Sequence, residues 1–435
     1  METIVIGITA FLGLYMAWNI GANDVANSMA DAVGSRALSV RNAVILAGIC
    51  EFAGAVLVGA PVTDTVRKGI VSPDSFLALP DITPEQAAAL FVIGMTSALL
   101  SAAIWLNVSS FMGLPVSTTH SIVGSVAGFG IAAAGWSSVQ WGKMTQIVLS
   151  WFISPIAGGI MAFIVFKFIS RSILGQDRPA RAAIKYAPFL VSAVTATVVL
   201  ATIYKGLKHV IGNISWLTPQ VSIYITVALS VISWFISRWW LGRQLSGKDD
   251  LSVDDQLELV ERVFVPLVII TSCSVAFAHG ANDVANSVGP LAAVVRVLQT
   301  GEVAQKVGVP FWVLVLGGSG IVLGLATFGY RVMYTVGTKI TEITPSRGVA
   351  ADLSATATVL LCTRLKLPIS TTHTLVGAIL GIGLARGLAG INRDVTKRIF
   401  GAWFVTVPAA ALLCVFLFLV GKMYFLDTIT RICTK

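Results

Sequence analysis

The sequence predicts an all-α polytopic membrane protein with about 12 membrane segments, in two inverted repeats that contain re-entrant or broken helices. The composition predicts the membrane: 56% of the 435 residues are hydrophobic and only 12% are charged. A soluble domain carries about 25% charged residues. A duplicated pair of motifs predicts the repeats, and the placement of basic residues predicts that the repeats are inverted.

Long uncharged runs divide the chain into membrane segments. Residues 189–203 and 221–236, for example, contain no charged side chain, and about 20 apolar residues are enough to span a bilayer as a helix. The predicted segments lie near residues 2–20, 42–60, 86–108, 111–134, 141–167, 187–204, 220–240, 263–279, 312–332, 347–364, 366–387 and 396–421. Hydropathy alone leaves open whether the motif-bearing segments cross the membrane or form re-entrant hairpins.

Two motifs occur twice in the same order. The octapeptide Gly21–Ser28 recurs without change as Gly280–Ser287, and Leu114–His120 returns as Leu367–His373 with one conservative change. The copies are 259 and 253 residues apart, so the chain is an internal duplication. We expect a first membrane repeat over 1–167 and a second, inverted membrane repeat over 262–435. Residues 168–261 are expected to form two linking membrane helices with basic cytoplasmic loops.

The densest basic cluster, within residues 167–185, sets the orientation. Lysine and arginine accumulate in cytoplasmic loops, so this cluster and the charged stretch 243–262, two crossings later, are both expected in the cytoplasm. If each repeat crosses an odd number of times, the first repeat starts outside and the second starts inside. We therefore expect a multi-pass protein of the cell membrane, which is the inner membrane in a bacterium.

Other signals argue against other classes of protein. The net charge of +9 does not indicate nucleic acid, because most basic residues lie near the ends of apolar segments and there contact lipid headgroups. The five cysteines have no paired spacing, so neither a disulfide framework nor a zinc site is expected. No zinc-protease or P-loop motif is present, and we expect neither enzymatic activity nor a cofactor.

Asp24 and Asp283 each lie in the middle of an otherwise apolar region. A carboxylate there costs about 2.5–3.5 kcal/mol on insertion scales. One alternative is structural: each aspartate could cap a helix that restarts after Gly-Ala-Asn. On that helix Asn27 and Ser28 would share a face with Asp24, giving the oxygen ligands that a hard cation prefers. The second repeat copies this set in Asp283, Asn286 and Ser287.

The second motif predicts a helix that starts after a proline. Pro115 disfavours helix in the residue before it, and Ser117 is then a suitable N-cap. Such a helix directs unpaired N–H groups and its positive dipole end at whatever faces it. A single copy could be a plain cap, but two copies favour a cradle for a tetrahedral oxyanion. Its hydroxyl groups are those of Ser117, Thr118, Thr119, Ser370, Thr371 and Thr372.

Two further acids, Glu51 and Asp352, lie within or near apolar runs, and their repeat partners are apolar. An ionisable group inside a membrane is a functional candidate by default. For Asp352 the alternative is a role at the start of a helix.

The chain resembles the inorganic phosphate transporter (Pit) family. The resemblance rests on the two octapeptides, on Thr65–Ile70 and on the two Pro-(Val/Ile)-Ser-Thr-Thr-His motifs, and it covers both repeats. It implies a sodium- or proton-coupled phosphate symporter. It also implies that the substrate and cation sites are lined by the two Ser-Thr-Thr triplets and by Asn23, Asp24, Asn282 and Asp283. The family carries acids at the positions of Glu51 and Asp352, more usually a glutamate at the latter.

We therefore expect a secondary active transporter that couples phosphate symport to Na⁺ as the coupling ion, by alternating access. Phosphate and two aspartates add negative charge, no lysine or arginine lies within the motifs, and bridging Na⁺ ions would offset the repulsion. The expected partners are inorganic phosphate, sodium ions and the lipid bilayer, with no nucleic acid and with a homo-oligomer left open. Open alternatives are a proton-coupled carrier of phosphate or a metal–phosphate complex, a sulfate carrier, and a receptor or channel without a coupling ion.

Overall fold

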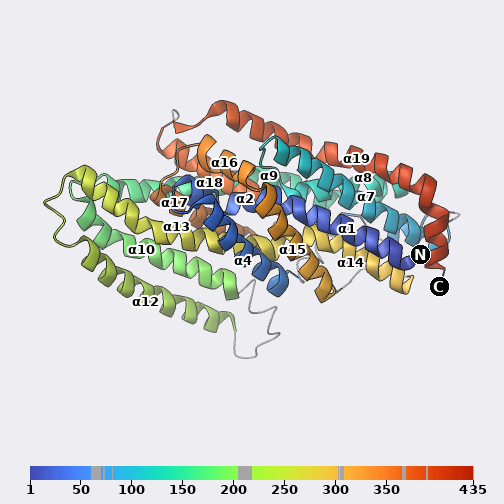
Figure 1. The fold of residues 1–435 in the computed structure, drawn as a ribbon, viewed down its shortest axis with the longest axis horizontal. Coiled ribbons are helices and arrows are strands. Elements are labelled where there is room, and N and C mark those ends of the chain that lie inside the picture. Colours follow the sequence, from blue (N-terminus) through green and yellow to red (C-terminus); the bar gives the residue numbers. More distant parts are fainter. Residues whose placement is uncertain are drawn as a thin grey trace.

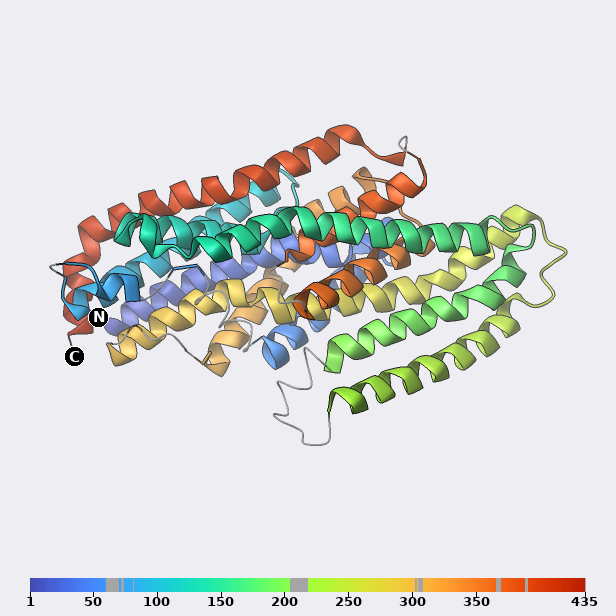
Figure 2. The same cartoon turned by 180° about the vertical axis from the view of Figure 1, so that it is seen from behind.

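The computed structural model describes residues 1–59, 70–71, 74–80, 82–203, 218–301, 303, 308–364, 369–387 and 390–434. Nearly all of these residues are helical, and the only extended pairing among them is an isolated antiparallel bridge between Val71 and Val139. Most helices run along the long axis, and both termini lie at the same end (Figure 1). Figure 2 shows the same arrangement from behind. The predicted all-α fold is confirmed.

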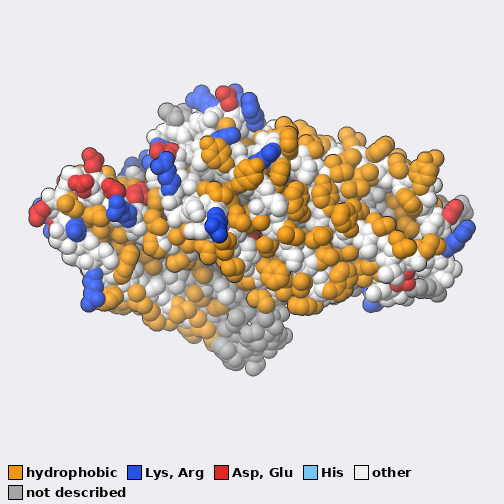
Figure 3. Space-filling view, in the orientation of Figure 1, with side chains coloured by type: hydrophobic (Ala, Val, Ile, Leu, Met, Phe, Trp, Pro, Cys, Tyr) orange, Lys and Arg blue, Asp and Glu red, His pale blue; other side chains and the backbone are white. Residues whose placement is uncertain are grey.

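The surface is that of a protein surrounded by lipid. Figure 3 shows hydrophobic side chains over the middle of one face, whereas charged side chains gather mainly toward the two ends. Large apolar side chains such as Phe235, Leu412 and Phe416 are well exposed. Within the described residues, nine helical segments are long and apolar enough to cross a membrane. These features match the predicted polytopic membrane protein, because apolar side chains at such density are stable only against hydrocarbon.

Each of the twelve predicted segments forms a helix. The helices are α1 (Glu2–Ile20), α4 (Val40–Val58), α7 (Pro84–Phe111), α8 (Thr118–Ala134), α9 (Trp141–Ile169), α10 (Pro179–Ala201), α12 (Pro219–Leu245), α13 (Val253–Asp283), α15 (Phe311–Phe328), α17 (Pro345–Arg364), α18 (Thr371–Ala385) and α19 (Arg393–Cys433). Helix α14 (Ala285–Thr300), which follows α13 with only Val284 between them, was not predicted from hydropathy. Pro290 and Arg296 interrupt its apolar pattern. The Thr65–Ile70 motif, apart from Ile70, and Leu367–Pro368 lie outside the described residues.

The two halves pack on each other reciprocally. Helix α1 packs against α15 of the second half, and α13, its counterpart, packs against α4 of the first. In the same way α19 covers α7 and α8, while α9 covers α17 and α18. Figure 1 shows α1 running from the terminal end toward the centre, whereas α13 runs toward the centre from the opposite end. The repeats are therefore inverted and interlocked.

Glycines of the duplicated octapeptide permit two of these contacts. A Cβ atom at Gly21 would overlap the backbone carbonyl of Ile321 in α15, and one at Gly280 would overlap the carbonyl of Glu51 in α4. Small residues let helix backbones approach closely in a membrane, where dispersion contacts drive association. Each octapeptide glycine thus allows its own repeat to pack closely against the other repeat.

Two helical hairpins carry the Ser-Thr-Thr motifs at their tips. Helices α7 and α8 are antiparallel, since Phe91 near the start of α7 contacts Phe129 near the end of α8 with ring centroids 6.4 Å apart. Helices α17 and α18 form the second hairpin, and Arg386, just after α18, hydrogen-bonds to Thr341, just before α17, at 3.3 Å. The hairpins enter from opposite ends, and their tips meet inside the molecule (Figure 1).

The inverted topology predicts where engineered cysteines react. Thr3 is in the first turn of α1, and Lys248 is in the charged connection between α12 and α13. The start of α1 and the α12–α13 connection lie at opposite ends of the molecule (Figure 1). A membrane-impermeant maleimide should label Thr3→Cys only from outside the cell and Lys248→Cys only from the cytoplasm, because the basic connection stays inside. The parent chain, with its own five cysteines, gives the background. Labelling of both variants from the same side would contradict the topology.

Candidate functional site

Asp24 and Asp283 lie where each long helix is locally distorted. Helix α1 continues without a break into a π-helical turn, η1 (Gly21–Val25), followed by the short α2 (Ala26–Ser28), and Asp24 lies in the π turn. Helix α13 runs through Asp283 and breaks only at Val284. The expected helix restart after Gly-Ala-Asn is therefore wrong. Neither aspartate caps a helix, because the junctions at Val25 and Val284 have no side-chain cap.

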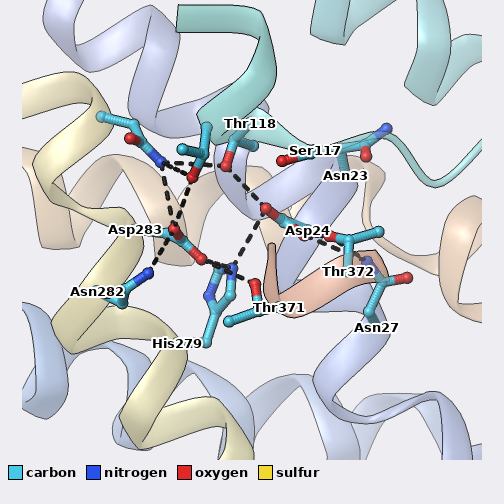
Figure 4. A network of polar contacts seen from close by, with 12 residues as sticks. Asn23, Asp24, Asn27, Ser117, Thr118, His279, Asn282, Asp283, Thr371 and Thr372 are labelled. Atoms are coloured by element: carbon cyan, nitrogen blue, oxygen red, sulfur yellow. Dashed lines mark hydrogen bonds and ion pairs between the residues drawn. The ribbon is translucent and has the colours of Figure 1, made fainter. Parts of the chain in front are cut away.

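The two carboxylates receive hydrogen bonds from both hairpin tips (Figure 4). Asp24 Oδ2 accepts from Thr118 in α8 at 2.8 Å, and Asp24 Oδ1 accepts from Thr372 in α18. Asp283 Oδ2 accepts from Thr371 at 3.1 Å, and its Oδ1 lies 3.5 Å from the hydroxyl of Thr119. Each aspartate thus takes the first threonine of its own repeat and the second threonine of the other. The pattern follows the pseudo-two-fold relation of the repeats.

The asparagine three residues after each aspartate extends the same pattern. Asn27 Nδ2 lies 3.3 Å from Asp24 Oδ1 and from Thr372 Oγ1. Asn286 Nδ2 lies 3.2 Å from Asp283 Oδ1 and from the hydroxyls of Thr118 and Thr119. The predicted i, i+3 face is therefore present in both repeats.

The serines after these asparagines differ from each other. Both are buried. Ser287 donates its hydroxyl to the Val284 carbonyl at 3.0 Å, whereas Ser28 lines the small cavity beside Asp24.

Ser117 and Ser370 start the two motif helices, as the sequence predicts. Their hydroxyls accept from the backbone N–H groups of His120 and His373, each at 3.3 Å. Helices α8 and α18 therefore direct their N-termini at the same pair of carboxylates from opposite sides. Each terminus carries unpaired N–H groups and about half a positive charge.

Asn23 and Asn282 occupy unlike positions. The Asn23 side chain donates to Ser110 Oγ and the Leu114 carbonyl, and accepts from the Val116 N–H, all at 3.0 Å. These bonds fasten the tip of the first hairpin to η1. Asn282 instead donates to Asp283 Oδ1 at 3.1 Å and so lies beside the carboxylates.

A buried histidine that the motifs did not indicate lies between the acids. His279 Nε2 is 2.8 Å from Asp283 and 3.5 Å from Asp24, and its Nδ1 is 3.0 Å from Glu51. His279 directly precedes the second octapeptide, and its counterpart 259 residues earlier is Ile20. An ionisable side chain inside an apolar helix is the signal that could have identified it.

The two additional acids have separate partners. Glu51 in α4 is fully buried and belongs to the central network, because both of its oxygens lie 3.0 Å from His279 Nδ1. Asp352 in α17 is also fully buried, but its Oδ2 accepts from Thr271 at 2.9 Å and from Ser272 at 2.7 Å in α13. Asp352 therefore lies in a second polar cluster.

The central network has little free space. The cavity beside Asp24, lined also by Asn27, Ser28, His279 and Thr371, has a volume of about 30 Å³. A water molecule needs about 10–15 Å³ measured in this way, so a small ion or a water fits there. A tetrahedral oxyanion would require the carboxylates and the threonines to move apart.

Comparisons with known proteins agree on one family. The family model described as the phosphate transporter family matches residues 20–414. A protein named as a phosphate permease in Thermococcus kodakarensis is 48% identical over 411 residues, covering 94% of this chain and 96% of that protein. A chloroplastic inorganic phosphate transporter of Arabidopsis thaliana is 40% identical over 427 residues, covering 94% of this chain and 70% of that protein. A solved structure described as the sodium-dependent phosphate transporter is 42% identical, with a TM-score of 0.83, and the match covers 97% of this chain and all of that one.

The position of His279 among three acids predicts that replacing it strongly lowers the stability of the fold. His279→Ala would leave Glu51, Asp24 and Asp283 buried without their shared partner, and breaking a buried charged pair costs about 3–5 kcal/mol. The melting temperature of the detergent-solubilised protein should fall, and adding Glu51→Gln should restore part of the loss by removing a stranded carboxylate. The exposed Arg262–Glu258 pair is the control, since removing such a pair costs about 0–1 kcal/mol. Unchanged melting of His279→Ala would contradict this assignment.

Proposed function

The chain belongs to the phosphate transporter family, and on that premise we propose that it carries inorganic phosphate across the cell membrane together with Na⁺. The observation that carries the proposal is the convergence of two helix N-termini and two buried carboxylates on one point. Helix N-termini attract an oxyanion, whereas carboxylates attract a cation. A site with both properties suits a transporter that takes the two ions together.

The anion half of the site comes from the hairpin tips. Thr118, Thr119, Thr371 and Thr372 supply hydroxyl donors, and the first turns of α8 and α18 supply backbone N–H donors. Phosphate oxygens bound there would face positive helix ends from both repeats. The Ser117 and Ser370 hydroxyls are themselves the helix caps and hold these turns in place, so they are not counted among the donors to phosphate.

The cation half of the site comes from the octapeptides. Asp24 and Asp283 supply carboxylate oxygens, and the Asn27 Oδ1 atom is buried without a hydrogen-bond donor. A buried acceptor left without a donor costs about 1–3 kcal/mol, and a bound cation would remove that cost. These oxygen ligands suit Na⁺, and Asn282, Asn286, Ser28 and Ser287 add neighbouring oxygen atoms. The His279 Nε2 lies beside them, 2.8 Å from Asp283.

Coupling follows from competition for the same hydroxyl groups. Without ions, the four threonines donate to Asp24 and Asp283, so the carboxylates occupy the donors that phosphate needs. Na⁺ bound to the carboxylate oxygens would replace those hydrogen bonds and cancel the repulsion of an incoming anion. Each ion then raises the affinity for the other by the same factor, as linkage requires. Because the hairpins come from opposite repeats, opening one side at a time gives alternating access.

Removal of either carboxylate charge should abolish coupled transport. We expect Asp24→Asn and Asp283→Asn each to lower sodium-dependent phosphate uptake by at least about tenfold, which corresponds to ~1.4 kcal/mol of lost ion binding. Uptake is measured in proteoliposomes, with the folded state checked by gel filtration. Asp427→Asn makes the same chemical change at an exposed position near the C-terminus and should transport normally. Near-normal uptake by either central variant would reduce that aspartate to a structural residue.

The coupling ion is tested with the unmodified protein. An inward Na⁺ gradient at fixed pH should drive uptake of radiolabelled phosphate, because the site offers oxygen ligands to a hard monovalent cation. An equal K⁺ gradient should not drive it. Uptake driven by a pH gradient alone would show proton coupling instead, and equal competition by sulfate would show that the site does not discriminate between tetrahedral oxyanions. Downhill flux without any coupling ion would indicate a channel.

A further inference from the structure

Two buried acids from different repeats face each other away from the central network. Asp31 lies in α3 (Ala30–Gly34), one short helix after Asp24, and Asp352 lies in α17, one arm of the second hairpin. Both side chains are fully buried. The two residues lie where α3 packs against α17. Gly348 in α17 allows this approach, since a Cβ atom there would lie 3.3 Å from that of Asp31.

Three of the four carboxyl oxygens of the pair have no protein donor. Asp352 Oδ2 accepts from the hydroxyls of Thr271 and Ser272. Asp352 Oδ1 and both oxygens of Asp31 are buried and have no hydrogen-bond partner within the described residues. Carboxylates can only accept, so two ionised groups in this position would repel each other with nothing between them.

No neighbouring base compensates the pair. Several other bases, acids and thiols lie on the elements that pack around the pair. The bases are Arg41 on α4, Arg262 and His279 on α13, Arg331 on α16 (Tyr330–Tyr334), Lys339 on η5 (Thr335–Lys339), Arg347 on α17, His373 on α18, Lys143 and Lys167 on α9, and Arg181 and Lys185 on α10. The acids and thiols are Cys50, Glu51, Asp254, Asp255, Glu258, Glu261, Cys273, Asp283 and Cys362. Among the nearest, Glu261 bonds to Thr344 and Ser346, and Arg347 bonds to Glu342. Within the described part of the chain, none of these groups hydrogen-bonds to Asp31 or Asp352.

We propose that Asp31 and Asp352 form a proton-binding site, in which one proton is shared between Asp31 and the free Oδ1 of Asp352. A proton needs only two neighbouring oxygens, which the unpartnered carboxyl oxygens of Asp31 and Asp352 supply. The same oxygens also suit a small cation, and the addition of Na⁺ in the experiment below distinguishes the two. The shared proton converts a repulsive contact into a hydrogen bond and leaves a single charge, which the two hydroxyls at Oδ2 stabilise.

The site exists only once in the duplicated chain. The counterpart of Asp31 is Pro290, 259 residues on, and that of Asp352 is Leu99, 253 residues back. The proton therefore joins one specific pair of elements: the segment after Asp24 and the hairpin arm that leads to Thr371 and Thr372. Loss of the proton should push α3 and α17 apart. This site is additional to the proposed sodium and phosphate site, and its existence does not depend on that proposal.

Infrared spectroscopy can detect the shared proton without any transport measurement. Purified protein is titrated from about pH 6 to about pH 9, the range in which a buried carboxyl beside a like charge loses its proton. The parent should show a protonated-carboxyl C=O band that shifts in heavy water and disappears as the pH rises. Asp31→Asn and Asp352→Asn should both lack that band, while Asp427→Asn should keep it. A band that is absent from the parent, persists in both variants, or is removed by Na⁺ at constant pH overturns the proposal.

Stability provides a second readout with the same variants. Asparagine can donate permanently to the remaining carboxylate, so Asp31→Asn and Asp352→Asn mimic the protonated pair and should fold. The bound proton stabilises the parent at low pH, and this contribution is lost as the pH rises. The melting temperature of the parent should therefore fall with rising pH more steeply than that of either variant. Parallel curves for all three proteins would overturn the proposal even if uptake is normal.

Discussion

Asp24 and Asp283 are carboxylates buried in an interior whose other side chains are mostly apolar, and the residues around them supply the hydrogen-bond donors that they need. An isolated charge in such surroundings would be prohibitively costly. The threonines of both hairpin tips meet that need, and they come from opposite repeats. The tips can reach the carboxylates only because each hairpin enters from its own end and stops at the centre. The need of the buried carboxylates for hydrogen-bond donors is therefore met only with the inverted topology.

Close packing between the repeats makes this geometry possible. Gly21 and Gly280 let α1 and α13 touch the backbones of α15 and α4. Glycines in α8 and α18 do the same for the hairpins: a Cβ at Gly124 would overlap the Val407 carbonyl of α19, and one at Gly377 would overlap the Pro155 carbonyl of α9. A side chain at any of these positions would separate helices from opposite repeats. These glycines thus allow close packing at the interface between the repeats.

The central site is symmetric in its threonines and asparagines but asymmetric in its charges. His279 and Glu51 have no counterparts in the other repeat, and neither do Asp31 and Asp352. His279 connects α13 to η1 and α4, so the second octapeptide is tied to the first repeat by a titratable group. A duplicated scaffold alone would give two equivalent half-sites. The added acids and the histidine make the two half-sites chemically different.

The sequence by itself determined the membrane class, the duplication, the positions of twelve helices and the residues of both motifs. These properties follow from local hydropathy and from exact repeats, which need no knowledge of distant contacts. It also identified the helix caps at Ser117 and Ser370, because capping depends on a few neighbouring residues. Only the tertiary structure decided which threonine bonds to which aspartate, that Asn23 holds a hairpin tip, and that His279 lies among three acids. Apart from the His279–Asp283 contact within α13, those contacts join residues roughly 90 to 350 positions apart. They exist because interlocked repeats place both hairpin tips at one point. A sequence pattern gives no information about the contact between the two hairpin tips.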